Sequence, residues 1–218
     1  ASRAILAARL CVIAPDGRVT RVTYGLLNLT HRESHELPRA LEPGVRYPVR
    51  LGLNDVALRV PAGYRLRLSL STSHWPLVWP SPQHATLALQ TAQCWLDIPV
   101  RPSGTGDEAV EFAPPTVPKA EPVKWLREVS RTRRVEHDLA SGETTVTWVK
   151  DDGAYRLEDN AMEVDAYGEE THTIFENQPL SARSTSTWHF EHRRGNWKVH
   201  VSASNTLRAT EESFFLET

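Results

Sequence analysis

The stretch that decides the fold is Ile5–Tyr24, ILAARLCVIAPDGRVTRVTY. Its first nine residues, Ile5–Ile13, form an almost continuous apolar run, which is typical of a central strand buried on both faces. In Ala14–Gly17 the proline presets φ and the glycine is free to take a positive φ, as a turn requires. Arg18–Tyr24 then alternates polar and apolar residues. The stretch therefore predicts a β-hairpin.

Outward from this hairpin, alternation with a period of two residues continues along the chain. It predicts strands around Tyr47–Leu53, Leu66–Leu70, Cys94–Ile98, Trp125–Asp138, Thr144–Lys150, Trp188–Phe190 and Trp197–Val201. Turn signals separate them at Pro61–Gly63, Ala140–Glu143, Asp151–Gly153 and Arg194–Asn196. Helical turns are expected only at Leu37–Leu41 and Glu158–Met162. Many short strands with frequent turns predict an all-β fold of the sandwich or barrel kind.

The composition limits the classes of protein to which the chain can belong. Of 218 residues, 40% are hydrophobic and 24% are charged, which argues against a disordered or a membrane-spanning chain. The formal net charge is -2, and because positive and negative residues are interspersed, no nucleic-acid or membrane partner is predicted. The 15 prolines lie mostly between apolar runs, as loops and strand ends allow.

Residues 101–122 interrupt the alternation with a run rich in proline and glycine. This stretch is either a linker between two small sandwiches or a long surface loop. We predict one domain over residues 1–218, because neither half has enough strands to close two sheets. The chain does not begin with methionine, and its single methionine is Met162, so we expect a piece of a longer polypeptide.

Cys11 and Cys94 each lie in an apolar run. A disulfide between them stays open, but we expect two buried thiols in a reducing compartment, and therefore a cytoplasmic location. The tryptophans outside one unusual loop lie in strand-like surroundings, and we expect most of them in the core. They are Trp95, Trp125, Trp148, Trp188 and Trp197.

Motifs that carry chemistry are absent from the sequence. There is no Gly-x-Ser-x-Gly nucleophile elbow, no phosphate loop, no dinucleotide-binding glycine motif and no Cys-x-x-Cys pair. His189 and His192 lie three apart in a predicted strand, where odd offsets point to opposite faces. His31 and His35 flank a loop. We predict no catalytic residue, no metal site and no cofactor.

One loop stands out, HWPLVWPSP at His74–Pro82, with two indoles and three prolines. Prolines reduce the entropy cost of ordering a loop, so its aromatic side chains are presented at little cost. The candidate pocket or domain-interface residues are therefore His74, Trp75, Trp79 and Ser81. Two other interpretations stay open: the loop closes over the end of its own sandwich, or Trp75 and Trp79 stack on a sugar ring in a carbohydrate-binding module.

Several segments together resemble the C-terminal non-catalytic domain of X-Pro dipeptidyl-peptidases and of cocaine-esterase/NonD-type hydrolases. The resemblance covers residues 5 to about 102 most clearly, and shorter matches follow. The segments are Ala8–Gly17, Gly25–Arg32, Pro61–Ser71, Trp75–Pro82, Asp138–Gly142 and Pro179–Ala182.

The resemblance implies a jelly-roll β-sandwich, similar to galactose-binding domains, that packs on an α/β-hydrolase domain of the same polypeptide. In that family the Ser-Asp-His triad lies in the α/β domain, so no triad residue is carried onto this chain. The chain alone is then not an enzyme, and esters, amides or X-Pro peptides are substrates of the parent hydrolase. Assembly into a homo-oligomer stays open.

Overall fold

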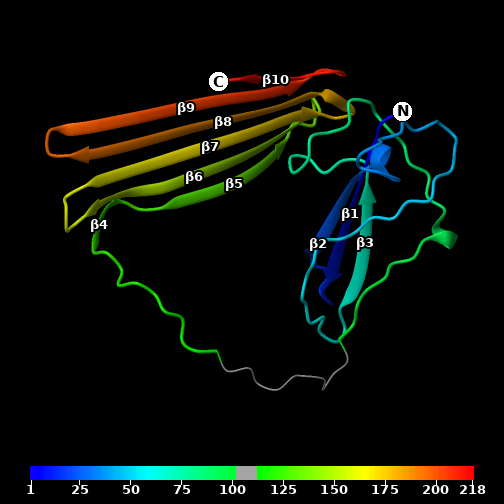
Figure 1. The fold of residues 1–218 in the computed structure, drawn as a ribbon, viewed down its shortest axis with the longest axis horizontal. Helices are drawn as coiled ribbons and strands as arrows, with labels where there is room; N and C mark the ends of the chain where they lie inside the picture. The colour runs from blue at the N-terminus through cyan, green and yellow to red at the C-terminus, as the bar shows by residue number, and fades with distance from the viewer. Residues whose placement is uncertain (102–111) are drawn as a thin grey trace.

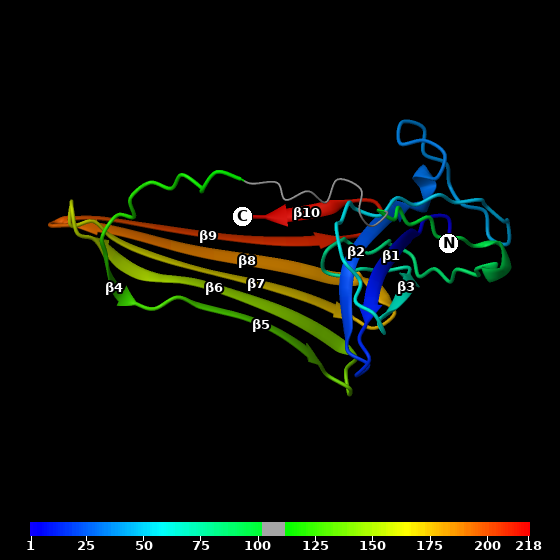
Figure 2. The same ribbon diagram turned by 90° about the horizontal axis from the view of Figure 1, so that it is seen from below.

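The computed structural model describes residues 1–101 and 112–218 and is nearly all β (Figure 1). Its strands form two antiparallel sheets, one of three strands and one of seven. The all-β prediction is confirmed, and two antiparallel sheets agree with the β-sandwich class. The three-stranded sheet lies at one end of the long strands of the other sheet (Figures 1 and 2).

The three-stranded sheet contains the predicted hairpin. Strands β1 (Ile5–Ile13), β2 (Val19–Asn28) and β3 (Arg65–Ser71) are arranged in the order β2-β1-β3. The hairpin turn closes with a hydrogen bond from the Ala14 N–H to the Arg18 carbonyl, and Gly17 has φ +86°. The apolar run of β1 reflects its central position, where it is covered along most of its length. The 3-10 helices η1 (Leu29–His31) and η2 (Thr91–Gln93) lie outside the sheet.

The second sheet is built from the C-terminal part of the chain. Its strands are β4 (Val123–Arg127), β5 (Ser130–His137), β6 (Glu143–Leu157), β7 (Glu163–Phe175), β8 (Gln178–Arg194), β9 (Trp197–Ala209) and β10 (Phe214–Glu217). The order is β10-β9-β8-β7-β6-β4, and β5 also pairs with β6. Sequential strands are neighbours, so β6 to β10 form a meander of long hairpins.

Strand β6 is twice as long as predicted because a predicted turn is a bulge. The register with β7 shifts between Asp151 and Ala154, where Gly153 has φ +78°. The Asp151 carboxylate accepts a hydrogen bond of 2.9 Å from the Gly153 N–H. Asp-Asp-Gly is a turn sequence, but one extra residue with positive φ also fits a β-bulge, and strand pairing continues beyond it.

Two predicted strands, Tyr47–Leu53 and Cys94–Ile98, are wrong, since both segments are extended but unpaired. The first crosses β2 at a single point. There the Thr23 hydroxyl donates to the Asn54 carbonyl at 2.7 Å, and the Asn54 N–H donates to the Tyr24 carbonyl at 2.9 Å. The second segment ends at a proline, which cannot donate to a ladder.

The predicted helical turns are wrong as well. Leu37–Leu41 contains Pro38 and has no helix. Glu158–Met162 is a tight turn, because Ala161 has φ +57° and the Asn160 side chain accepts a hydrogen bond from the Met162 N–H at 2.9 Å. A left-handed residue stops a right-handed helix.

Residues directly opposite in the register share a face. One face of the seven-stranded sheet is polar; the other, which we call the apolar face, is apolar at one end but also carries the polar row Glu170–Ser186–Asn205. The polar face shows rows such as Tyr167–His189–Ser202 and Thr171–Thr185–Thr206. The apolar face shows rows such as Ala166–Phe190–Val201 and Val164–His192–Val199. One face of this sheet is therefore built to be covered.

The covering is incomplete. The accessible surface is 16202 Å², whereas a compact monomer of this mass exposes about 10,000 Å². Trp95, Trp125 and Trp197 are 80%, 45% and 49% exposed, so the prediction of a core position is wrong for them. Cys11 is buried, but Cys94 is exposed, against expectation, and both thiols are free.

Domain organisation over residues 1–218 stays a prediction. Part of the proline- and glycine-rich stretch 101–122 lies outside the described residues, and residues 112–122 contain no strand. Within residues 1–101 and 112–218, no helix has the length and the apolar character that crossing a lipid bilayer requires.

We predict that Gly25→Ala destabilises the fold by about 1–3 kcal/mol, because the added methyl group overpacks the crossing of residues 51–54 over β2. A Cβ at Gly25 would lie 2.1 Å from the Gly52 carbonyl oxygen and 2.6 Å from Leu51 Cδ2. Urea unfolding measures the loss. Gly52→Ala is the control, since a Cβ there has no atom within 4 Å and should change little. Equal stability of the two variants would contradict the crossing.

Candidate functional site

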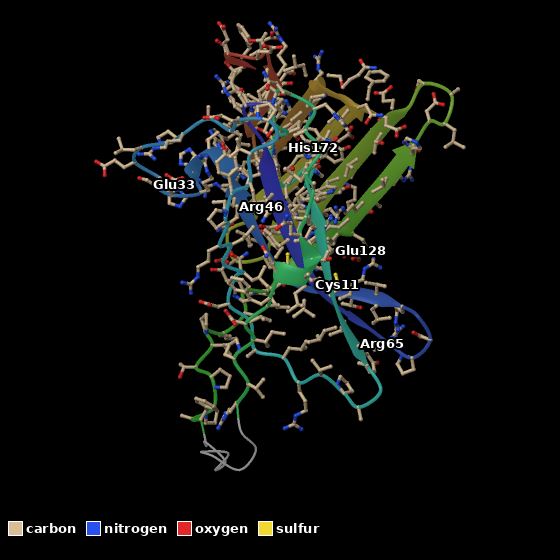
Figure 3. All side chains as sticks on the ribbon, turned by 90° about the vertical axis from the view of Figure 1, so that its right-hand side faces the viewer. Cys11, Glu33, Arg46, Arg65, Glu128 and His172 are labelled. Carbon is tan, nitrogen blue, oxygen red and sulfur yellow. The ribbon has the colours of Figure 1, made fainter. Side chains whose placement is uncertain are left out.

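The candidate site is the loop His74–Pro82, which follows β3 and joins the two sheets. The Trp75 ring packs edge-to-face on His172 of β7, with the ring centroids 6.0 Å apart. The Trp79 ring packs in the same manner on Phe214 of β10 at 5.7 Å, and the two indoles contact each other at 5.2 Å. His172 lies where the loop meets the C-terminal sheet (Figure 3).

His74 is the most buried residue of the loop, with 7% of its surface exposed. Arg21 Nη1 lies 3.3 Å from His74 Nε2, and since a guanidinium only donates, the imidazole accepts. Burial lowers the pKa of His74 below its ordinary value of 6.5, and the positive charges of Arg9 and Arg21 lower it further. The hydrogen bond and the pKa both favour neutral His74.

Two further hydrogen bonds are made by residues at the N-terminus, and the second of them reaches the C-terminal part of the chain. The Ser2 N–H donates to the side chain of Gln83 at 3.1 Å, just beyond the loop. Arg3 donates to the carbonyl of Glu211, in the turn between β9 and β10, at 3.3 Å. Ser81 is half-buried at the end of the loop.

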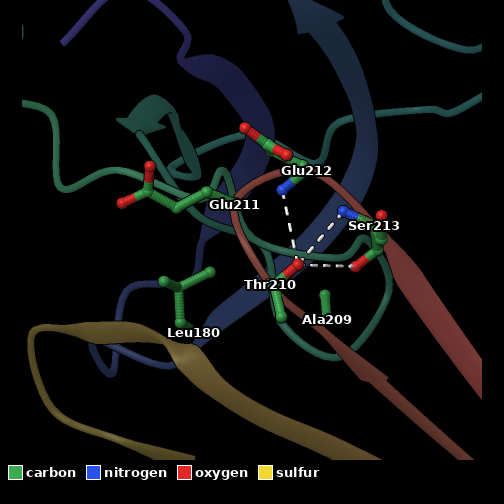
Figure 4. A pocket seen from close by; sticks show the side chains of 6 residues that line it. All are labelled: Leu180, Ala209, Thr210, Glu211, Glu212 and Ser213. Atoms are coloured by element: carbon green, nitrogen blue, oxygen red, sulfur yellow. Dashed lines mark hydrogen bonds between the residues drawn. The ribbon is translucent and has the colours of Figure 1, made fainter.

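An open concavity lies at the turn between β9 and β10 (Figure 4). Its lining consists of Leu180 and residues 209–213. Thr210 organises the turn, because its hydroxyl accepts from the Ser213 N–H at 3.2 Å. The hydroxyls of Thr210 and Ser213 lie beside the carboxylates of Glu211 and Glu212 in this lining. The Thr210 hydroxyl is engaged within the turn, since it also accepts from the Glu212 N–H at 3.5 Å.

Three side chains on the covered part of the apolar face are those of a hydrolase triad. Ser184 Oγ lies 2.7 Å from His172 Nδ1, and Glu170 Oε2 lies 3.7 Å from His172 Nε2. The second distance is too long for a hydrogen bond, so the carboxylate does not orient the imidazole. Burial lowers the pKa of His172, and the nearby Glu170 charge partly opposes this effect.

The backbone around Ser184 is unsuited to acyl transfer. Ser184 lies opposite His172 on β7 and opposite Leu207 on β9, so its strand is paired on both sides. The backbone N–H groups of such a strand donate to the neighbouring strands, and no pair of them is free to stabilise an oxyanion. We interpret Ser184 as the hydrogen-bond partner of a buried imidazole.

No group of three metal-binding side chains occurs within the described part of the chain. His189 lies opposite Tyr167, and His192 lies opposite Val164, so the two histidines occupy opposite faces as predicted. The rings of His31 and His35 are 5.4 Å apart in a loop.

The fold defines the class of protein as all-β, with two antiparallel sheets. The family model of the X-Pro dipeptidyl-peptidase C-terminal non-catalytic domain matches residues 1–114, and the chain belongs to this family. The match contains all of the three-stranded sheet and the whole loop His74–Pro82. No curated protein and no solved structure gives a significant match.

The assignment of His74, Trp75, Trp79 and Ser81 to a pocket or domain interface stays a prediction. Sequence reasoning missed the residues that Trp75 and Trp79 contact, His172 and Phe214. The alternation that places His172 on the apolar face was visible in the sequence, but the pairing of the loop with that face depends on tertiary structure.

We predict that stability falls as the pH is lowered through 6.5, in part because of His74. Its pKa is lower in the folded than in the unfolded state, so the unfolded state binds more protons in this window and unfolding is favoured. The melting temperature at about pH 7.5 and pH 5.5 measures the effect. His74→Gln, whose amide oxygen still accepts from Arg21, should reduce the difference, and His84→Gln at an exposed position should not. An unchanged pH dependence in His74→Gln would contradict this role.

Proposed function

We propose that this chain is the non-catalytic C-terminal part of a serine acyl hydrolase. The parent enzyme is of the X-Pro dipeptidyl-peptidase or cocaine-esterase/NonD type and acts on an ester, amide or peptide. The chain packs on the α/β-hydrolase domain of the same polypeptide and helps to form the substrate pocket. The observation that carries the proposal is the family match over residues 1–114.

The packing role is supported by a row of half-exposed leucines on the edge strand β3 of the three-stranded sheet. Leu66, Leu68 and Leu70 lie opposite Val12, Leu10 and Ala8, and so share one face. The three β3 leucines remain 47%, 41% and 37% exposed, although Leu10 opposite them is 8% exposed. A row of half-exposed leucines beside a buried strand is suited to contact with another domain.

The pocket role is supported by the shape of the loop His74–Pro82. Its two indoles are held against the C-terminal sheet, while Leu77 at its turn is 45% exposed. A loop fixed on one side presents the other side at little entropy cost. The sugar-binding alternative gains no support, since edge-to-face contacts occupy the rings of both Trp75 and Trp79.

We predict that the isolated chain does not hydrolyse p-nitrophenyl esters or X-Pro-p-nitroanilides above the buffer rate, because Ser184 has no oxyanion-stabilising groups. Stopped or continuous absorbance assays measure this. Ser184→Ala separates the outcomes: hydrolysis by the chain that disappears in this variant would overturn the non-catalytic assignment, whereas activity that persists in it comes from a contaminant.

We predict that Leu68→Glu lowers the melting temperature of the parent polypeptide by several degrees more than that of the isolated chain. Leu68 is 41% exposed in the chain, and in the proposed parent enzyme the catalytic domain covers this exposed part. Differential scanning fluorimetry of both proteins gives the two shifts. Arg67→Glu, on the other face of β3, is the matched control. Equal shifts for Leu68→Glu in the two proteins would place the catalytic domain elsewhere.

A further inference from the structure

One face of the three-stranded sheet collects positive charge. Strands β1, β2 and β3 contain four arginines and no aspartate or glutamate. Cys11 lies opposite both Arg21 and Arg67 in the register, so these three side chains share a face. Arg9 and Arg65 lie two residues from this row on β1 and β3, and therefore point to the same side. We call the four side chains the arginine cluster.

The charges of the arginine cluster are not neutralised by the chain. Within residues 1–101 and 112–218, none of the four arginines forms an ion pair with a carboxylate. Arg9 is half-buried; its Nη2 donates to Ser71 Oγ at 3.0 Å, while its Nε is buried without a hydrogen-bond partner. Arginine is rarely buried unless it is paired, because removing a charge from water is costly. A half-buried guanidinium in this situation is suited to an anionic ligand.

Two members of the cluster come together at His74, the first residue of the loop His74–Pro82. Arg21 Nη1 lies 3.3 Å from His74 Nε2, and the Arg21 guanidinium carbon lies 5.1 Å from the centre of the Tyr24 ring. Tyr24 lies opposite Arg9 in the register, and the charges of Arg9 and Arg21 both act on His74. Since His74 is neutral, two positive charges repel each other here, and a group with two negative charges would relieve this repulsion.

We propose that the arginine cluster binds a dianionic phosphate group, free or as a monoester, between Arg9, Arg21 and Arg67. A guanidinium group is a planar fork of N–H donors that matches the oxygens of a phosphate in pairs. A phosphate monoester carries nearly two negative charges at neutral pH. It therefore offsets both positive charges at His74, whereas a single carboxylate or a phosphodiester, with one negative charge each, offsets only one.

The arginine cluster is open to a ligand of this size. Arg21, Arg65 and Arg67 are exposed, whereas the small side chain of Cys11 between the strands is buried. Arg21 and Arg67 lie two strand spacings apart, about 10 Å, so both side chains can extend over Cys11 toward one anion. The leucines that we propose to contact the catalytic domain lie on the opposite face. The phosphate site is therefore accessible in the parent enzyme and does not depend on the proposed hydrolase function.

The test is isothermal titration calorimetry of the chain with inorganic phosphate at constant ionic strength. We expect saturable binding of one phosphate per chain. Arg21→Gln should weaken binding about tenfold or more, because it removes a charge-assisted hydrogen bond, and Arg67→Gln should weaken it as well. Arg18→Gln is the matched control: it replaces an exposed arginine of the same hairpin, which lies 3.8 Å from Asp16, and should leave the affinity unchanged.

Three further ligands identify the source of the phosphate group. Phenyl phosphate is a monoester and should bind; binding of only one of phenyl phosphate and inorganic phosphate supports the proposal and names the ligand. Dimethyl phosphate, a diester with one charge, should not bind.

Circular dichroism verifies that each variant is folded, and Arg67→Gln decides the test if Arg21→Gln is not. A folded wild-type chain that binds neither inorganic phosphate nor phenyl phosphate would overturn the proposal. Binding that Arg21→Gln and Arg67→Gln leave unchanged, or that Arg18→Gln weakens equally, would also overturn it. Succinate or dimethyl phosphate that binds as tightly as the phosphate dianions would do the same.

Discussion

The edge-to-face packing of Trp75 on His172 and of Trp79 on Phe214 is the interaction on which the arrangement of the two sheets depends. Each such pair contributes about 0.5–1.5 kcal/mol beyond the apolar area that it buries. The pairs place the loop over the apolar face of the C-terminal sheet at the point where Val146 and Ala182 become buried. Without this loop, the whole face of a long meander would be exposed to water.

The residue before Trp75, His74, is held in its neutral form. His74 is drawn between Arg9, Arg21 and Tyr24, and its neutral form is the one that accepts from Arg21. Because His74 is neutral, it links the loop to Arg9 of β1 and Arg21 of β2 without adding a third positive charge. Protonation of His74 at low pH therefore weakens the contact of the loop with β1 and β2.

The sequence predicted what depends on local alternation and turns, and it failed where tertiary packing decides. The hairpin of Ile5–Tyr24 could be predicted from the sequence, because Pro15 and Gly17 specify a turn between two strand-like segments. Asp151–Gly153 reads as a turn in isolation, and only the partner strand β7 makes it a bulge. The unusual loop was evident from Trp75 and Trp79, but their partners His172 and Phe214 lie about a hundred residues away or more, and no local pattern predicts that pairing.

The two sets of half-exposed apolar residues belong to different parts of the chain. The leucines of β3 lie within residues 1–114, the region common to the family, so their partner is sought among domains that the family shares. The seven-stranded sheet follows that region and contacts the loop His74–Pro82 through His172 and Phe214, at one end of its long strands. The rows Ala166–Phe190–Val201 and Val164–His192–Val199 are the apolar part of this face, and Phe190 and Val201 there are 39% and 51% exposed, which is costly in water.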